Sequence, residues 1–162
     1  MIFVTTGTHE QQFNRLVTEV DRYAAEHSED VFVQYGYETM PPAHAKGDRL
    51  IARDVMDELM RNARVIVTHG GPGSIWGAFE YNKIPIVVPR QAKYGEHVDN
   101  HQLLFCRRLA KSKRVLLVED ISDLTPLIQE YETQMQDCVP PAQVSNTNRK
   151  RFCELLSRQF GG

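Results

Sequence analysis

Short apolar runs rich in β-branched residues alternate along this chain with longer segments whose apolar positions recur at helical spacing. The short runs predict strands at residues 2–6, 31–35, 64–68, 85–89 and 114–118. The periodic segments predict helices at 12–26, 55–62, 74–81, 98–111 and 124–136, and a last one from about 146 to 160. Several strands are apolar at nearly every position, which is typical of parallel strands covered on both faces. The alternation therefore predicts the α/β class, as a single Rossmann-like domain with a parallel sheet flanked by helices.

The length of the chain and one proline pair set its expected domains. The 162 residues fit one domain and leave little room for a second lobe. Pro140 and Pro141 should break the chain before the last helix. We expect the body at residues 1–140 and a C-terminal amphipathic helix within 141–162, with an apolar face of Phe152, Leu155, Leu156 and Phe160. The periodicity leaves open whether that face packs on its own domain or on a partner.

Composition and charge narrow the class of protein. Hydrophobic residues make up 41% of the chain and charged residues 25%, with a formal net charge of -2, which is typical of a soluble globular protein and indicates no nucleic-acid partner. The N-terminal segment has no basic leader, and no stretch approaches the roughly 18 apolar residues of a membrane-spanning helix, so we expect a cytoplasmic protein. The three cysteines are widely spaced without a Cys-x-x-Cys pair, which argues against a disulfide framework and a zinc knuckle.

Three loops that follow predicted strands are rich in glycine or polar residues, at 7–9, 69–74 and 90–100. Ligands of parallel α/β sheets bind outside the carboxyl ends of the strands, so these loops are where a site is expected. Gly70, Gly71 and Gly73 let backbone N–H groups approach an anion, and the following helix N-terminus adds about half a positive charge. The second loop therefore predicts a phosphate seat, with a tight turn that binds nothing as the alternative.

The same loop excludes several nucleotide-binding classes. Its glycine spacing fits neither the dinucleotide motif nor the P-loop, which argues against a kinase, an ATPase or a nicotinamide enzyme. Ser74 can cap the helix or donate its hydroxyl to a phosphate oxygen. Further along, Gly73, Gly77 and Glu80 share one stripe along which a nucleoside can lie, with Glu80 either accepting from ribose hydroxyls or merely solvated. Asn82 stands where the helix should end, and asparagine tolerates the left-handed conformation there.

Residues 96–102 place six polar side chains around one apolar residue. Carboxylates, amides and imidazoles at such density suit the hydroxyl groups of a hexose. His97 and His101 could instead bind a metal with Glu96, although no further ligand is evident. His9 and His69 each follow a strand beside glycines, where a ring can contact a diphosphate, move a proton or do neither.

Several of these segments together resemble one known family. They read TGTH at 6–9, THGGPGS at 68–74, KIPIVVPRQ at 83–91, EHV at 96–98 and HQ at 101–102. They are similar to bacterial capsular and exopolysaccharide glycosyltransferase subunits of the family-28 C-terminal-domain group, and to the soluble subunit of the eukaryotic dolichol-linked UDP-GlcNAc transferase. The resemblance covers residues 1–120 in order. It implies a domain equivalent to the C-terminal, donor-binding half of a GT-B enzyme.

The resemblance also implies an activity and partners. The chain would be the UDP-sugar-binding catalytic subunit of a heteromeric, metal-independent glycosyltransferase that transfers a hexose to a polyprenyl-diphosphate-linked saccharide in capsule or exopolysaccharide synthesis. A membrane-anchored, acceptor-binding subunit would supply the second lobe and the catalytic base, and would recruit this chain to the inner face of the cell membrane. No cofactor is implied, because the UDP-sugar is itself the substrate and backbone groups would stabilise its diphosphate.

Carried over by position, the resemblance lets Gly7, Thr8 and the loop 70–74 seat the diphosphate, while Glu96 and His97 hold the hexose. Asn100 matches the asparagine three residues after that pair. Together with the histidines and Glu80, the predicted donor-binding residues are Gly7, Thr8, His9, His69, Gly70, Gly71, Gly73, Ser74, Glu80, Glu96, His97 and Asn100.

The sequence departs from the family at two positions. Gly77 stands where relatives in the wider superfamily have a glutamate for the ribose, so that contact is absent or is made by Glu80. His97 replaces a glutamine, which leaves the identity of the sugar open.

Two other classes of function compete with this interpretation. A complete small hydrolase would need a nucleophile and a base in one chain, and the sequence has no Gly-x-Ser-x-Gly elbow. A noncatalytic, UDP-sugar-binding regulatory module would bind the nucleotide sugar without turnover.

Overall fold

Six strands form one parallel sheet within residues 1–38 and 40–141, which the computed structural model describes. The strands are β1 (Ile2–Thr5), β2 (Val31–Gln34), β3 (Lys46–Asp48), β4 (Val65–His69), β5 (Ile86–Val88) and β6 (Leu116–Leu117). Their order is β3-β2-β1-β4-β5-β6, and every neighbouring pair is parallel. This is the doubly wound order of Rossmann-like domains, which confirms the predicted fold class.

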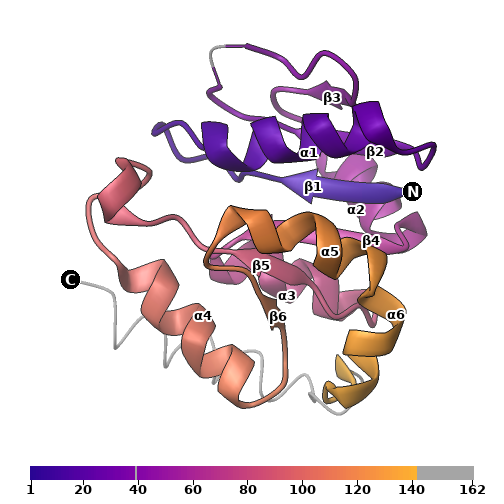
Figure 1. The fold of residues 1–162 in the computed structure, drawn as a ribbon, viewed down its shortest axis with the longest axis vertical. Helices are drawn as coiled ribbons and strands as arrows, with labels where there is room; N and C mark the ends of the chain where they lie inside the picture. Colours follow the sequence, from indigo (N-terminus) through magenta and orange to yellow (C-terminus); the bar gives the residue numbers. More distant parts are fainter. Residues whose placement is uncertain (39, 142–162) are drawn as a thin grey trace.

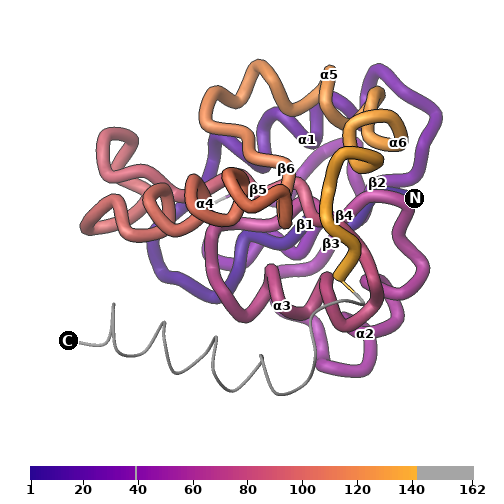
Figure 2. The backbone as a smooth tube through the Cα atoms, turned by 90° about the horizontal axis from the view of Figure 1, so that it is seen from below, coloured from indigo at the N-terminus to yellow at the C-terminus, as the bar shows by residue number. Residues whose placement is uncertain are grey.

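Helices cover both faces of the sheet (Figure 1). They are α1 (Asn14–Glu26), α2 (Arg53–Asn62), α3 (Pro72–Glu80), α4 (His101–Lys111), α5 (Leu124–Gln129) and α6 (Tyr131–Gln134), with single 3-10 turns at Ala92–Tyr94, Ile121–Asp123 and Met135–Asp137. Figure 2 shows α1 and α5 on one side of the sheet and α2 and α3 on the other. The helices therefore make a three-layer α/β/α arrangement around the sheet.

Side-chain alternation along the strands assigns each residue to a layer. Ile2 and Val4 of β1 belong to the apolar cluster under α1 and α5, whereas Phe3 between them packs against α2 and α3. Val87 of β5 packs on the same side as Phe3, in a cluster with α3 and α4. Because successive residues of a strand point to opposite faces, the nearly all-apolar strands fill both layers.

The strand order places the loops after β1 and β4 at a topological switch point. These two strands are neighbours at the centre of the sheet, and their chains then leave in opposite directions, β1 into α1 and β4 into α3. In open α/β sheets a ligand crevice lies at such a point, outside the carboxyl ends of the strands. The predicted loops at 7–9 and 69–74 both lie there.

The structure corrects the predicted elements in two places. Strand β3 was not predicted, because Lys46-Gly47-Asp48 has no apolar residue and joins the sheet at its edge through backbone pairing with β2. The single helix expected at 124–136 is broken at Glu130 into α5 and α6. The bend turns Tyr131 into the core, where its hydroxyl donates to the Ile84 carbonyl at 2.7 Å.

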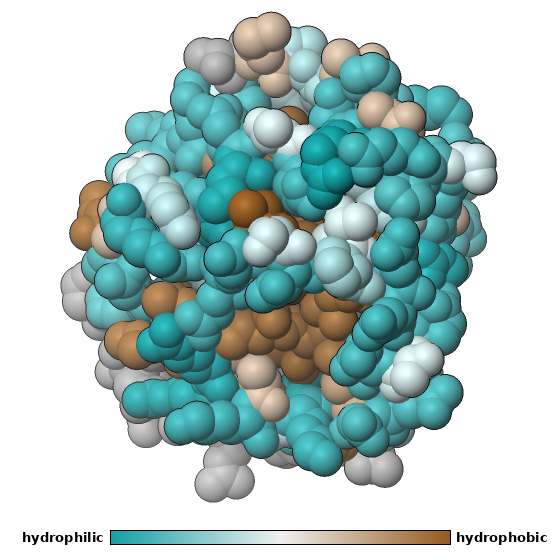
Figure 3. Space-filling model, in the orientation of Figure 1, coloured by the Kyte–Doolittle hydropathy of each residue, from teal (hydrophilic) through white to brown (hydrophobic). Residues whose placement is uncertain are grey.

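The opposite edge of the sheet ends in the two-residue strand β6. Figure 3 shows a mostly hydrophilic face with a broad apolar area below α5, between α4 and α6. Leu116 and Leu117 of β6 are half-buried. Among the described residues no helix is long and apolar enough to cross a membrane. The predicted C-terminal amphipathic helix falls on residues 142–162, which lie outside the described part of the chain.

Candidate functional site

The two glycine loops of the switch point close on a single imidazole. His69 ends β4 and is only 9% exposed. A Cβ atom added to Gly7 would lie 2.5 Å from His69 Cε1, and one added to Gly71 would lie 2.2 Å from His69 Nε2. Gly7 also has φ +78°, a conformation that favours glycine. Any side chain at either position would displace the ring, so the two loops need glycine to approach each other.

The His69 ring is neutral at ordinary pH. Burial lowers its pKa to about 4, and the positive charge of Arg90 acts in the same direction. Its Nδ1 atom is buried and has no hydrogen-bond partner in the described chain. The His69 side chain is therefore a fixed, uncharged group between the two loops and not a cation.

Helix α3 begins with unpaired backbone donors. Gly71 occupies the N-cap position, Pro72 begins the helix, and no side chain caps it. The predicted capping by Ser74 is therefore wrong: the fixed φ of proline starts the helix two residues earlier, which places Ser74 inside the first turn. The first amide that donates within the helix is that of Ile75, to the Gly71 carbonyl at 3.2 Å, so the amides of Gly73 and Ser74 before it can donate to a ligand. At the other end, Asn82 has φ 56°, which confirms its predicted left-handed conformation.

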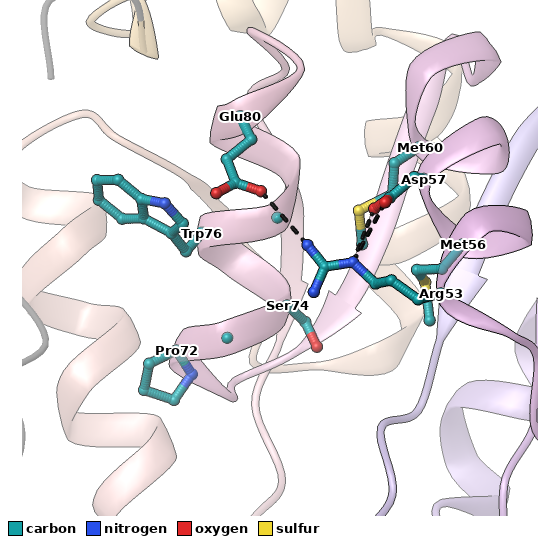
Figure 4. A pocket seen from close by; sticks show the side chains of 10 residues that line it. Arg53, Met56, Asp57, Met60, Pro72, Ser74, Trp76 and Glu80 are labelled. Atoms are coloured by element: carbon teal, nitrogen blue, oxygen red, sulfur yellow. Dashed lines mark hydrogen bonds and ion pairs between the residues drawn. The ribbon is translucent and has the colours of Figure 1, made fainter. Parts of the chain in front are cut away.

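A pocket of about 350 Å³ runs between α2 and α3, beside that helix terminus (Figure 4). Its wall on α3 is the predicted stripe of Gly73, Gly77 and Glu80, together with Ser74. From α2, Arg53 reaches across toward α3, with its guanidinium 3.8 Å from the Glu80 carboxylate. The remaining lining residues are Met56, Asp57, Met60, Pro72 and Trp76.

Gly77, which lines the pocket, leaves room for the Met60 side chain of α2. A Cβ atom at position 77 would lie 3.0 Å from the Met60 thioether sulfur, so a side chain there requires Met60 to move. Glu80, one turn further along the same stripe, is the carboxylate that this chain has in the pocket.

A buried arginine that the sequence analysis did not single out ties the loops together. Arg90 is 1% exposed, and its guanidinium donates to the carbonyl groups of Thr6, Gln11, Gln12 and Glu96 at 2.7–3.3 Å. Burial lowers the pKa of Arg90, while the carboxylates of Glu38 and Glu96 oppose that shift. Arg90 follows the end of β5 by two residues, and its position just after a strand was the one signal in the sequence.

Glu38 is a second buried charged residue of the site that the sequence pattern did not predict. It is 2% exposed and accepts a hydrogen bond from the Phe13 amide, and burial raises the pKa of its carboxyl. Only its place in the loop after β2 marks it in the sequence.

Glu96 is held by a second arginine. Its Oε1 accepts from Arg15 Nε at 2.8 Å, and its Oε2 accepts from Arg15 Nη2 and from the Gln91 amide, both at 3.0 Å. Arg15 also donates to the carbonyl of Pro89. The Glu96 carboxylate is 3% exposed, so the structure gives it a role in fixing the loop after β5, and its direct contact with a sugar stays a prediction.

The other predicted residues occupy the loops around this centre. His9 and His97 bring their ring centroids to 4.9 Å from each other across the two loops. Asn100 precedes α4, and its Oδ1 accepts from the Ala92 amide at 3.0 Å. Thr8 is exposed, whereas a Cβ atom at Gly70 would meet Gln102 of α4 at 2.8 Å.

The described residues contain no group of three or more His, Cys, Asp or Glu side chains arranged to hold a metal ion. His97 and His101 are instead joined through Asp99, whose carboxylate lies 3.3 Å from His97 Nδ1 and 3.0 Å from His101 Nδ1. The metal alternative therefore finds no third ligand in this part of the chain.

Solved structures of glycosyltransferases share this fold. The spinosyn forosaminyltransferase SpnP matches with a TM-score of 0.58 and 14% identity over 96% of this chain and 43% of its own. MurG of Acinetobacter baumannii matches with a TM-score of 0.56 and 15% identity over 92% of this chain and 49% of its own. The kitacinnamycin glycotransferase matches with a TM-score of 0.57 and 14% identity over 84% of this chain and 34% of its own. The chain thus spans between a third and a half of the length of these proteins.

No curated protein matches this sequence. The model of one protein family covers residues 1–157, almost the whole chain, and the parallel sheet with its glycine loops is the fold of the C-terminal half of GT-B glycosyltransferases. The chain belongs to the glycosyltransferase family 28 C-terminal domain family.

Proposed function

We propose that this chain is the UDP-sugar-binding catalytic subunit of a heteromeric glycosyltransferase that transfers a hexose to a polyprenyl-diphosphate-linked saccharide in capsule or exopolysaccharide synthesis. The observation that carries the proposal is the closure of the Gly7 and Gly71 loops around His69, beside the uncapped start of α3 and the pocket along it. Membership of a glycosyltransferase family supports the reaction class.

In this proposal the diphosphate lies at the N-terminus of α3. The amides of Gly73 and Ser74 donate to its oxygens, and the partial positive charge of the helix end, about half a unit, adds to them. Backbone donors preorganised in this way stabilise the negative charge that grows on the leaving UDP as the glycosidic bond to the donor breaks. A metal ion is not required for this role.

The nucleoside occupies the pocket between α2 and α3. Its ribose hydroxyls donate to the carboxylate of Glu80, which lines the pocket 3.8 Å from the Arg53 guanidinium. Gly73 leaves the wall of α3 open to the ligand, since a Cβ atom there would meet nothing within 4 Å. The hexose lies toward the loop after β5, where Asn100 is the group that reads its hydroxyls, and where Arg15 holds Glu96 in place.

The acceptor side of the reaction belongs to a partner. The glycosyltransferases of the same fold are more than twice as long as the part that this chain covers. We infer that a membrane-anchored, acceptor-binding subunit supplies the second lobe and the base that takes the acceptor proton, and that it recruits this chain to the inner face of the cell membrane.

Calorimetric titration with UDP and a panel of UDP-sugars tests the donor site. Gly73→Leu is the decisive variant, because a Cβ atom at Gly73 meets nothing within 4 Å and only a ligand at the helix end would collide with the new side chain. Thr18→Leu, on an exposed position of α1, is the matched control. We expect a loss of UDP affinity of at least about tenfold for Gly73→Leu and none for Thr18→Leu. Equal affinity of both variants would remove the donor site from this helix end.

Transfer assays with and without the partner subunit test the catalytic role. Turnover that requires both chains supports the proposal. Binding of UDP-sugar with no turnover in either condition contradicts it, and that result fits a noncatalytic regulatory module.

A further inference from the structure

His9 and His97 form a pair at the switch point although they come from different loops. His9 lies between β1 and α1, and His97 lies between β5 and α4. Their ring centroids are 4.9 Å apart and the ring planes are inclined by 42°. Both side chains are half-buried, with the His97 side chain 18% exposed. The pair therefore has fixed surroundings and is still reachable by a ligand.

The same backbone contact holds each ring. Nδ1 of His9 accepts a hydrogen bond from the Gln11 amide at 3.1 Å, and Nδ1 of His97 accepts one from the Asp99 amide at 3.3 Å. A nitrogen that accepts a hydrogen bond carries no proton, so a neutral ring in this position has its proton on Nε2. Both neutral rings thus present an Nε2–H donor. For His97 this assignment follows the hydrogen bond from the Asp99 amide, and the Asp99 carboxylate lies at the same 3.3 Å from Nδ1.

The charges around the pair favour the neutral form of His9. Burial lowers the pKa of His9, and the positive charge of Arg90 and the neighbouring His97 act in the same direction, with Glu10 opposing them. His69, the third imidazole of the cluster, is also neutral. On the side of His97, the Asp99 carboxylate lies 3.3 Å from Nδ1 and is shared with His101.

We propose that His9 and His97 act together as hydrogen-bond donors, each through Nε2–H, to oxygens of the diphosphate of the bound nucleotide, and that neither ring is the base of the reaction. This inference rests on the proposed function, because it needs an anionic ligand at the switch point. The loops position the pair for this role: His9 follows Gly7 by two residues, and Arg90 fixes both loops through the carbonyl groups of Thr6 and Glu96.

A donor role and a base role predict different rescue by glutamine. The amide nitrogen of glutamine reaches the place of Nε2 and donates, but it cannot accept a proton from a hydroxyl. We expect His9→Leu and His97→Leu each to weaken UDP binding about tenfold, as the loss of a hydrogen bond to a charged group does, and His9→Gln and His97→Gln to recover most of that loss. Calorimetric titration of the four variants against UDP gives the comparison.

The tautomer is a second readout that does not depend on ligand binding. Nitrogen chemical shifts of the two rings at pH 7.5 distinguish a proton on Nε2 from one on Nδ1. Two results would overturn the inference: rings protonated at Nδ1, or glutamine variants that bind UDP as weakly as the leucine variants. If the wild-type protein binds UDP in that case, the proposed function still stands. A wild-type protein that binds no UDP contradicts the proposed function instead, even with both protons on Nε2.

Discussion

Acid should destabilise this fold specifically through His69. The folded protein holds the pKa of this ring at about 4, whereas an unfolded chain has the ordinary value of 6.5. The unfolded state therefore binds the proton first as the pH falls. The stability that comes from a neutral His69 is complete above pH 6.5 and is lost progressively between pH 6.5 and pH 4.

The size of the effect follows from the difference of the two pKa values. A gap between 6.5 and about 4 corresponds to roughly 3 kcal/mol at pH values below both. At pH 5 the unfolded ring is almost fully protonated while the folded ring is not, so about 2 kcal/mol of this is already lost. That loss is a large fraction of the stability of a small domain, which is about 5–15 kcal/mol.

Urea denaturation at several pH values measures this loss. Trp76 is the single tryptophan and is 8% exposed, so its fluorescence reports the unfolding of α3 and the sheet beneath it. His69→Gln removes the titrating group and leaves the carboxylates that also protonate in this range, so it is the reference at each pH. The free energy of unfolding of the wild type, taken relative to His69→Gln, should fall by about 2 kcal/mol between pH 7.5 and pH 5.

Two results would refute the reasoning. One is a difference between wild type and His69→Gln that stays constant from pH 7.5 to pH 5, with equal denaturant slopes for both proteins. The other is a direct titration of the His69 ring by NMR with a midpoint near 6.5, since that value would place the ring in water rather than between the two glycine loops.

Three further variants or treatments test the same architecture. Gly71→Ala should lower the free energy of unfolding by about 1–3 kcal/mol, because the new Cβ atom would stand 2.2 Å from His69. Gly73→Ala, inside α3 with nothing within 4 Å of the new Cβ atom, should instead raise it by up to about 1 kcal/mol, and urea denaturation compares the two. Arg90→Met should lower the free energy of unfolding by about 3–5 kcal/mol in the same assay, since it leaves four carbonyl groups and the nearby carboxylates without their cation. A smaller loss than that of Gly71→Ala would contradict the role of Arg90 in holding the loops together. Cys106 should resist iodoacetamide at pH 8 in the folded protein, because burial raises the pKa of its thiol to about 12; peptide mass mapping checks this, and modification without unfolding would contradict it.

The elements that the sequence predicted are those in which local pattern and tertiary structure agree. The apolar runs of β1, β4 and β5 are buried on both faces, so hydrophobicity alone marks them. The glycines at 70, 71 and 73 mark the turn into α3 for the same reason, because a strand-to-helix turn that closes on an imidazole excludes side chains. Strand β3 lacks such a signal, since its three residues contribute backbone hydrogen bonds and no apolar side chain.

The polar interior of the site could not be predicted because its contacts join distant segments. Arg15 and Glu96 are 81 positions apart in the chain, and Arg90 reaches back 84 positions to Thr6. Nothing in the local sequence separates these residues from solvated charges. Glu96 shows the consequence: its residue type suits a sugar-binding carboxylate, but the fold pairs both of its oxygens with donors from the protein.

The charges of the site favour a diphosphate held by neutral donors. Arg90 is a buried cation of the site, yet its guanidinium donates to backbone carbonyl groups and lies near the carboxylates of Glu38 and Glu96. Burial holds the pKa of His69 at about 4, and burial together with Arg90 lowers the pKa of His9. In the proposed donor site, a ligand therefore meets the start of α3 and imidazole N–H groups, whose fixed dipoles do not reorganise during the reaction. A leaving diphosphate gains negative charge during transfer, and such fixed dipoles stabilise that charge without binding the ground state as tightly as a cluster of lysines would.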